Sequence, residues 1–285
     1  MRTAHYAGAG GLQLAADVWD GRREPYILFI PGGGQTRGAW RRTAVGMAAK
    51  GFGVISLDLR GHGESEWARD ADYSIDAFVG DVRAVAATLP APPVLVGASI
   101  GGIAALIAVG ESTEPPARAV VLVDVAPNMS DEGLDRIRCF MTAGTRGFDA
   151  VEQAAEAVAR YRPQPRRSAS GGLRSHLRVG PDERYYWHWD PAFHRASKQR
   201  AAAGMLARMA AAARSVRIPA LLITGARSEV VSREAALDLQ RLIPGAHSVE
   251  IANAGHMVAG DENEVFDAAV GRFVDGLALS HPSNT

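Results

Sequence analysis

Short apolar runs alternate with segments of helical periodicity along most of the chain. Each run has the length of a buried strand and is bounded by glycine, proline or charged residues. The runs cover residues 25–30, 53–58, 93–97, 119–124 and 220–225, and residues 248–251 predict a further short strand. Helical periodicity is found at residues 39–50, 75–89, 100–109, 233–242 and 263–278. Strands that alternate with helices predict βαβ units, and therefore an α/β protein with a mainly parallel central sheet flanked by helices.

Two parts of the chain depart from this alternation. Residues 4–19 predict a hairpin, with two short strands around a glycine-rich turn at residues 7–11. Residues 128–216 show helical periodicity and no convincing buried strand. The helical segments of this insert cover 131–143, 148–160 and 196–214. A helical insert within an α/β core is the simplest account, so the core is predicted to consist of residues 1–127 and 217–285.

The composition is that of an ordinary globular protein. The 285 residues are 47% hydrophobic and 22% charged, and a chain of this length can bury a substantial core. Lys plus Arg and Asp plus Glu each total 31, so the formal net charge is zero. This balance gives no support for a nucleic acid or an anionic membrane as the main partner.

Cysteine content and apolar stretches bear on the compartment. The single cysteine, Cys139, excludes an internal disulfide and a cysteine-rich metal site. Residues 1–6 lack the apolar segment of a signal peptide, and the longest apolar stretch, residues 103–109, is far short of a bilayer span. The sequence therefore predicts a cytoplasmic protein without a membrane partner, and it leaves the oligomeric state open.

A candidate nucleophile follows the strand predicted at residues 93–97. Residues 97–101, Gly-Ala-Ser-Ile-Gly, match G-x-S-x-G and stand between an apolar strand and a helix. A sharp strand–turn–helix leaves no room for side chains at either glycine, and it exposes the Ser99 hydroxyl. The Ile100 N–H then lies at a helix N-terminus, where it can bind an oxyanion. A turn that only caps the helix is the alternative, but the flanking strand and helix favour the nucleophile.

Three motifs together resemble the α/β-hydrolase superfamily. They are the serine turn at 97–101, the segment D-L-R-G-H-G-E-S at 58–65 and the segment N-A-G-H-M at 253–257. The resemblance covers nearly the whole chain and implies the α/β-hydrolase fold, with residues 128–216 as its helical cap. The motifs are strongly specific for the fold and weakly specific for the substrate.

A serine hydroxyl is a poor nucleophile until a base removes its proton, so a histidine is required. Of the eight histidines, His256 is the best candidate. It follows the last predicted strand in a glycine-flanked loop, where the resemblance also places the catalytic base. His62 lies in a glycine-rich loop after another strand and is interpreted as structural.

The acid of the triad departs from the commonest pattern. Many relatives carry it three residues beyond the glycine that ends the strand after the cap, and here Ser228 stands at that position, with Glu229 beside it. Another place for the acid is the end of the strand after the nucleophile helix, which is occupied by Asp124. A buried acid at a strand end needs a partner, and an imidazole N–H is suitable. Asp124 is therefore favoured over Glu229, although it could serve only to cap the next turn.

A second oxyanion donor is expected from residues 31–35, Pro-Gly-Gly-Gly-Gln, which follow the strand at 25–30. We call these residues the glycine loop. Relatives typically begin it with His-Gly, whereas Pro31 stands here. Because consecutive glycines let the backbone approach an oxyanion closely, the Gly33 N–H is the predicted donor beside that of Ile100.

Candidates for the substrate pocket are Gly34 and an aromatic cluster in the cap. Residues 185–189 read Tyr-Tyr-Trp-His-Trp, and Trp187 and His188 are expected either to form a wall above Ser99 or to belong to a small core of the cap. The sequence shows no metal-binding motif, and the glycine loop lacks the Lys-Ser/Thr of a phosphate-binding loop. No metal or cofactor is therefore predicted.

Together these residues predict a serine hydrolase that cleaves an ester or related acyl bond of a small or medium-sized molecule. Ser99, His256 and Asp124 would form the triad, and the N–H groups of Gly33 and Ile100 would hold the oxyanion. Two alternatives stay open: a carbon–carbon bond hydrolase that uses the same triad, and a ligand-binding protein of this fold with little turnover.

Overall fold

The computed structural model describes residues 1–161, 172–195, 204–256, 258 and 264–279. Its central feature is an eight-stranded sheet with the order β1-β2-β4-β3-β5-β6-β9-β10. The strands of this sheet are β1 Arg2–Ala7, β2 Gln13–Trp19, β3 Arg23–Ile30, β4 Phe52–Leu57, β5 Val94–Ala98, β6 Ala119–Val123, β9 Ala220–Gly225 and β10 His247–Ile251. Every strand predicted from an apolar run is therefore present.

The pairing of the strands follows the prediction. Strands β1 and β2 form the antiparallel hairpin expected for residues 4–19, and β2 also pairs antiparallel with β4. All the other neighbouring strands, from β4 across to β10, pair parallel. The α/β class with a mainly parallel sheet is confirmed.

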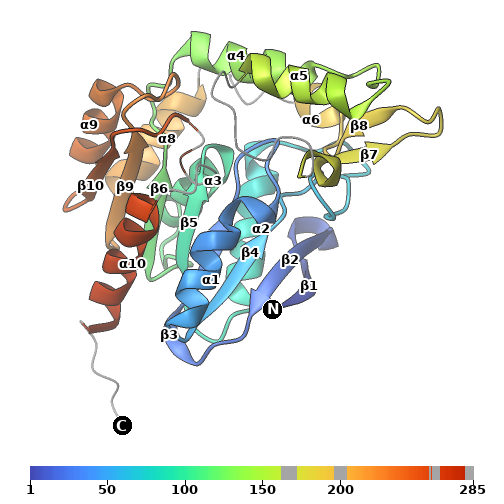
Figure 1. The fold of residues 1–285 in the computed structure, drawn as a ribbon. Coiled ribbons are helices and arrows are strands. Elements are labelled where there is room, and N and C mark those ends of the chain that lie inside the picture. Colours follow the sequence, from blue (N-terminus) through green and yellow to red (C-terminus); the bar gives the residue numbers. More distant parts are fainter. Residues whose placement is uncertain (162–171, 196–203, 257, 259–263, 280–285) are drawn as a thin grey trace.

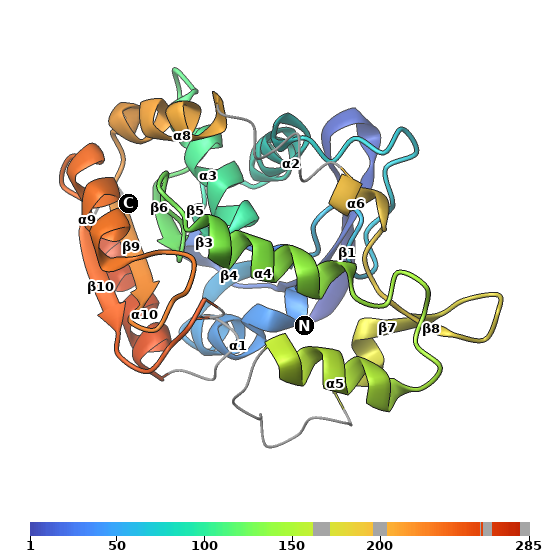
Figure 2. The ribbon, with the colours of Figure 1, turned by 90° about the horizontal axis from the view of Figure 1, so that it is seen from above.

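Helices cover both faces of the sheet (Figure 1, Figure 2). Leu28 and Ile30 of β3 belong to one apolar core, which includes residues of α2 (Ile75–Ala87), α3 (Ile100–Gly110) and α9 (Arg233–Leu242). Ile27 and Phe29 belong to a second core with α1 (Arg41–Ala49) and α10 (Glu264–Leu279). Successive side chains of a strand point to opposite faces, which explains why residues 27–30 of this strand are all apolar.

Helix α8 (Gly204–Ser215) packs beside α3 on the same side of the sheet (Figure 2). A methyl group on Gly110 would lie 2.2 Å from the carbonyl oxygen of Ala212, so the glycine allows the two backbones to approach. Residues 196–203 of the helix predicted at 196–214 lie outside the described residues. The division into core and cap stays a prediction, and α8 packs on the core although it falls within the predicted cap.

The remaining described elements of residues 128–216 are α4 Asp131–Thr142, α5 Val151–Tyr161, η3 Leu173–His176, β7 Leu177–Val179, β8 Tyr185–Trp187 and α6 Ala192–Arg195. Figure 1 shows α4 and α5 above one end of the central sheet. No buried strand was expected in this segment, and the two strands it contains, β7 and β8, form a short antiparallel pair in which most residues are not buried. Strands of three residues are too short for an alternation of apolar and polar positions to be recognised.

Candidate active site

Ser99 lies in the turn between β5 and α3 with φ 48° and ψ −122°, a conformation that is costly for a residue with a side chain. The two glycines of the motif make this turn possible. A methyl group on Gly97 would lie 2.5 Å from the carbonyl oxygen of Gly101, and one on Gly101 would lie 2.4 Å from that of Pro31. The motif is therefore required by the packing of the turn against α3 and the glycine loop.

Asp124 occupies the corresponding position at the end of β6, also with a positive φ of 48°. Its side chain is 1% exposed, so the carboxylate needs hydrogen-bond donors. The Gly225 N–H donates to Oδ1 at 3.1 Å, and the Ser228 hydroxyl donates to Oδ2 at 2.6 Å. These contacts fix the carboxylate at the end of the sheet.

The third partner of Asp124 is His256, whose Nδ1 lies 2.6 Å from Oδ2. Because the carboxylate accepts, we assign the proton to Nδ1, which leaves Nε2 with a free lone pair. Ser99 and His256 line the same cavity. The structure therefore brings together the three residues that the sequence proposed as a triad.

The alternative acid, Glu229, has a different environment. Its side chain is 52% exposed and forms an ion pair with Arg136 at 2.8 Å. Ser228 accounts for the departure from the commonest pattern. It stands at the position where the resemblance places the acid, and its hydroxyl donates to Asp124. Its Oγ also accepts hydrogen bonds from the backbone N–H groups of Val230 and Val231.

The glycine loop lies beside the nucleophile. Gly32, Gly33 and Gly34 all line the cavity with Ser99 and Ile100. The side chain of Gln35 is buried, and its Oε1 accepts a hydrogen bond from the Gly32 N–H at 2.8 Å. This contact stabilises the loop, which begins with Pro31. The role of Gln35 could not be predicted from the sequence, because a glutamine at the end of a glycine run forms no distinctive pattern.

The cavity above Ser99 has a volume of about 260 Å³. Most of its walls are apolar side chains, which come mainly from α2, α3, α4, α6 and α8. The polar side chains in the lining, besides Ser99 and His256, are those of Gln35, Asp131, Arg138, Tyr161 and His194. The apolar lining residues are Ile75, Ala98, Ile100, Ile103, Met129, Leu134, Ile137, Phe140, Met141, Phe193, Met205, Leu206 and Met209. Methionine is flexible and polarizable, so these walls can adapt to apolar groups of different shape.

Trp187 and His188 are not among the residues that line this cavity. The Trp187 ring stacks on Trp189 with centroids 5.0 Å apart and packs edge-on against Phe148 at 5.2 Å. Its Nε1–H donates to the carbonyl oxygen of Ala143. The aromatic cluster thus packs with other residues of the predicted cap, and of the predicted pocket residues only Gly34 lines the cavity.

His188 is buried, and burial holds the pKa of its imidazole well below the usual 6.5, with smaller contributions from His62 and His176. The unfolded chain therefore binds a proton below about pH 6.5 that the folded protein does not. The free energy of unfolding must fall as the pH falls below that value.

This difference in proton binding can be measured with His188→Gln, which has no titratable group at this position. Between pH 7.5 and pH 5.5, we expect the wild type to lose about 1.4 kcal/mol of stability relative to the variant, as measured by urea unfolding. The histidines other than His62 and His176, whose ring centroids lie 5.9 Å and 5.8 Å from that of His188, contribute equally to both proteins. A constant difference across this pH range would show that folding does not shift the pKa of His188.

Two further features concern partners. Among the described residues, no group of three or more His, Cys, Asp or Glu side chains is arranged to hold a metal ion. Over the same residues, no helix is both long and apolar enough to cross a membrane.

Comparison with known proteins agrees with this fold. The sequence matches the alpha/beta hydrolase family over residues 27–269, and the chain belongs to that family. It is 25% identical over 262 residues to a 3-hydroxybutyrate-oligomer hydrolase of Cupriavidus necator, covering 87% of this chain and 88% of that protein. It is 32% identical over 139 residues to an esterase of Mycobacterium tuberculosis, covering 48% of this chain and 43% of that protein.

A solved structure of an E-2-(acetamidomethylene)succinate hydrolase superposes with a TM-score of 0.83 at 23% identity, covering 96% of this chain and 99% of that one. This likeness shows the shared fold. The sequence relatives are hydrolases and esterases, and the chain is accordingly an enzyme of the hydrolase class.

Proposed function

We propose that this enzyme is a serine hydrolase that cleaves carboxylic esters with an apolar acyl group. The observation that carries the proposal is the hydrogen bond between Asp124 and His256 at the cavity that Ser99 also lines. A buried, fully hydrogen-bonded carboxylate on Nδ1 holds the imidazole in the tautomer that a general base requires.

In the proposed reaction, Ser99 Oγ attacks the ester carbonyl carbon while His256 Nε2 takes the hydroxyl proton. The carbonyl oxygen becomes an oxyanion, to which the N–H groups of Gly33 and Ile100 donate. When the carbon–oxygen bond of the leaving alcohol breaks, His256 returns the proton to that alcohol. Water then attacks the acyl-enzyme with His256 again as base, which releases the acid and restores Ser99.

The apolar acyl group is inferred from the cavity lining. Each methylene buried against such walls contributes about 0.8 kcal/mol, or roughly a fourfold gain in binding. A carboxylate among these apolar side chains loses hydration that they cannot replace. Arg138 also lines the cavity, but its guanidinium is already paired with Asp135. The proposed substrate therefore differs from the succinate derivative that names the superposed hydrolase.

A series of p-nitrophenyl esters tests this substrate class. We expect kcat/KM to rise by up to about fourfold per methylene from acetate onward until the cavity is filled. An ester whose acyl chain ends in a carboxylate should react at least about tenfold more slowly than its apolar counterpart of equal length. Leu134→Trp, which fills part of the cavity, should shift the optimum to shorter chains.

The matched control for that series is Leu237→Trp, which adds the same side chain at an exposed position on α9 and should leave the optimum unchanged. Acetate as the best substrate of the wild type, or an optimum that Leu134→Trp does not shift, would contradict an acyl-binding role for the cavity. Cleavage of a diketone but of no ester would instead favour the carbon–carbon bond hydrolase.

A further inference from the structure

The imidazole of His188 bridges two loops of the core. Its Nδ1 lies 2.8 Å from the backbone nitrogen of Gly63, and its Nε2 lies 3.3 Å from the carbonyl oxygen of Gly34. The Gly63 N–H is a donor, so Nδ1 must accept. A neutral imidazole then carries its proton on Nε2 and donates it to Gly34. One side chain of the cap thus satisfies a donor in one loop and an acceptor in the other.

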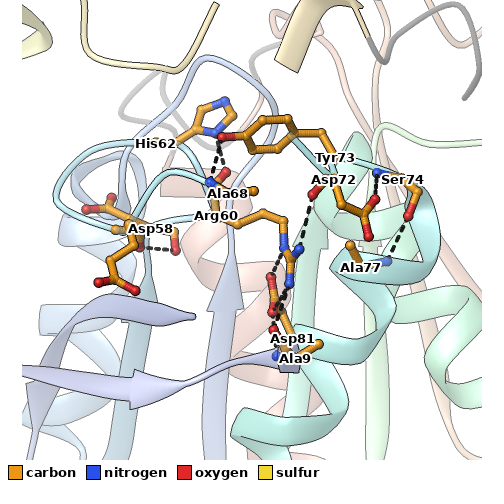
Figure 3. Close-up of polar contacts among 12 residues, drawn as sticks. Ala9, Asp58, Arg60, His62, Ala68, Asp72, Tyr73, Ser74, Ala77 and Asp81 are labelled. Carbon is orange, nitrogen blue, oxygen red and sulfur yellow. Dashed lines mark hydrogen bonds and ion pairs between the residues drawn. The ribbon is translucent and has the colours of Figure 1, made fainter. Parts of the chain in front are cut away.

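The loop that receives Nδ1 is itself firmly held. The Glu64 N–H donates to the buried carboxylate of Asp58 at 3.0 Å. Arg60 forms a buried, bidentate ion pair with Asp81, with both N–O distances at 2.7 Å. Figure 3 shows this pair, together with His62, whose Nδ1 contacts the carbonyl oxygen of Arg60. Gly63 therefore provides a fixed point for the cap.

Residues that follow His188 attach the cap to the same loop. The Asp190 N–H donates to the carbonyl oxygen of Gly61 at 2.8 Å, and the Tyr73 hydroxyl donates to the Asp190 carboxylate at 2.5 Å. The Tyr73 hydroxyl in turn accepts from the Ala68 N–H, as Figure 3 shows. The position of the His188 ring is therefore determined by several contacts besides its own.

The loop that receives Nε2 is the glycine loop. Gln35 holds its beginning through the Gly32 N–H, and His188 holds its end through the Gly34 carbonyl. Gly34 has φ +76° and fits closely under the cap: a methyl group there would lie 3.1 Å from Met141 and 3.4 Å from Trp189. Glycines move freely unless their backbone groups are bound, so these two contacts limit how the intervening Gly33 can turn.

We propose that His188 is a positioning residue for the oxyanion hole, because its hydrogen bond to Gly34 fixes the glycine loop with the Gly33 N–H facing the reacting carbonyl. The inference rests on the proposed function. His188 does not line the cavity, so it is not placed to contact a substrate bound there. The cap thus contributes to catalysis by fixing a backbone donor of the core, in addition to enclosing the acyl group.

Two substitutions separate the contacts of the ring. The side-chain amide of asparagine reaches the place of Nδ1, so in His188→Asn its oxygen can accept from Gly63 while the contact to Gly34 is lost. The amide of glutamine reaches the place of Nε2, so in His188→Gln its NH₂ group can donate to Gly34 while the contact to Gly63 is lost. Each variant removes one buried hydrogen bond, and both should lower Tm.

The catalytic effects of the two variants should differ. Removal of an oxyanion-hole donor lowers kcat by about 10²–10³-fold. A misplaced donor should lower kcat by a smaller factor. We expect kcat for the best p-nitrophenyl ester to fall about tenfold or more in His188→Asn and by no more than about threefold in His188→Gln, with similar KM in both. Equal losses of kcat, or losses that follow Tm, would overturn the positioning role.

Amide hydrogen exchange of the peptide that contains residues 31–35 gives a readout independent of turnover. Exchange in this peptide should be faster in His188→Asn than in the wild type and nearly unchanged in His188→Gln; equal exchange in all three would also overturn the inference. Failure of the proposed function has a different signature. If the wild type hydrolyses no ester, the proposed function is wrong. Amide exchange still tests whether His188 orders the glycine loop.

Discussion

Replacement of Ser99 by alanine is expected to lower kcat for ester hydrolysis by about 10⁶-fold, because the alternative path requires direct attack by water without a covalent intermediate. Substrate binding should survive, since the cavity walls are unchanged. Steady-state assays with the best p-nitrophenyl ester, together with a binding measurement on the inactive variant, check both points. Activity within tenfold of the wild type would show that another group is the nucleophile.

Ser99→Gly provides the matched control, because it removes the same hydroxyl and also relieves the backbone. Serine at φ 48° is costly, and glycine adopts such a conformation without a steric penalty. We expect Ser99→Gly to be as inactive as Ser99→Ala. Its free energy of unfolding should exceed that of Ser99→Ala by about 1 kcal/mol. An inactive but more stable variant would show that the enzyme sacrifices stability to hold its nucleophile.

The second large effect is expected for Asp124→Asn, which should lower kcat by about 10⁴-fold. The amide is nearly the same shape as the carboxylate, but it cannot stabilise the imidazolium of His256 and does not enforce the Nδ1–H tautomer. Glu229→Gln serves as the matched control and should leave kcat within about twofold, because Glu229 is paired with Arg136. A collapse of activity in Glu229→Gln, with Asp124→Asn active, would reverse the assignment.

Ser228 allows a rescue of the Asp124 variant. Its Oγ and the Nδ1 of His256 both lie 2.6 Å from the same oxygen of Asp124. A carboxylate introduced by Ser228→Asp should therefore reach His256, and the double variant Asp124→Asn/Ser228→Asp should recover at least about tenfold in kcat. Asp124→Asn/Ser228→Ala should recover none. Failure of this rescue would mean that the acid must stand at the end of β6.

The parts of the fold that could be predicted are those with long, regular patterns. The inner parallel strands β4, β5, β6 and β9 are buried on both faces and therefore appear as continuous apolar runs, and the helices between them keep their periodicity. Strands β7 and β8 could not be predicted, because three residues are too few to show an alternation of apolar and polar positions. The elements of the predicted cap also differ in where they pack. Helix α8 packs on α3 of the core as well as lining the cavity.

The site divides in the same way. Ser99, Asp124 and His256 each stand at the end of an element that could be recognised, so their proximity follows from the topology of a parallel sheet. The contacts of Gln35, Ser228 and His188 depend on how loops distant in sequence meet, and no local pattern reports that. The aromatic residues around Trp187 were equally consistent with a pocket wall and a cap core, and only their packing decided between these.

The most direct test of the account is the site at which a fluorophosphonate probe reacts with the purified enzyme. Peptide mapping by mass spectrometry should find one adduct per chain on Ser99, with labelling abolished in Ser99→Ala and strongly slowed in Asp124→Asn. An adduct on a different residue, or undiminished labelling and ester hydrolysis in Ser99→Ala, would contradict the proposed triad.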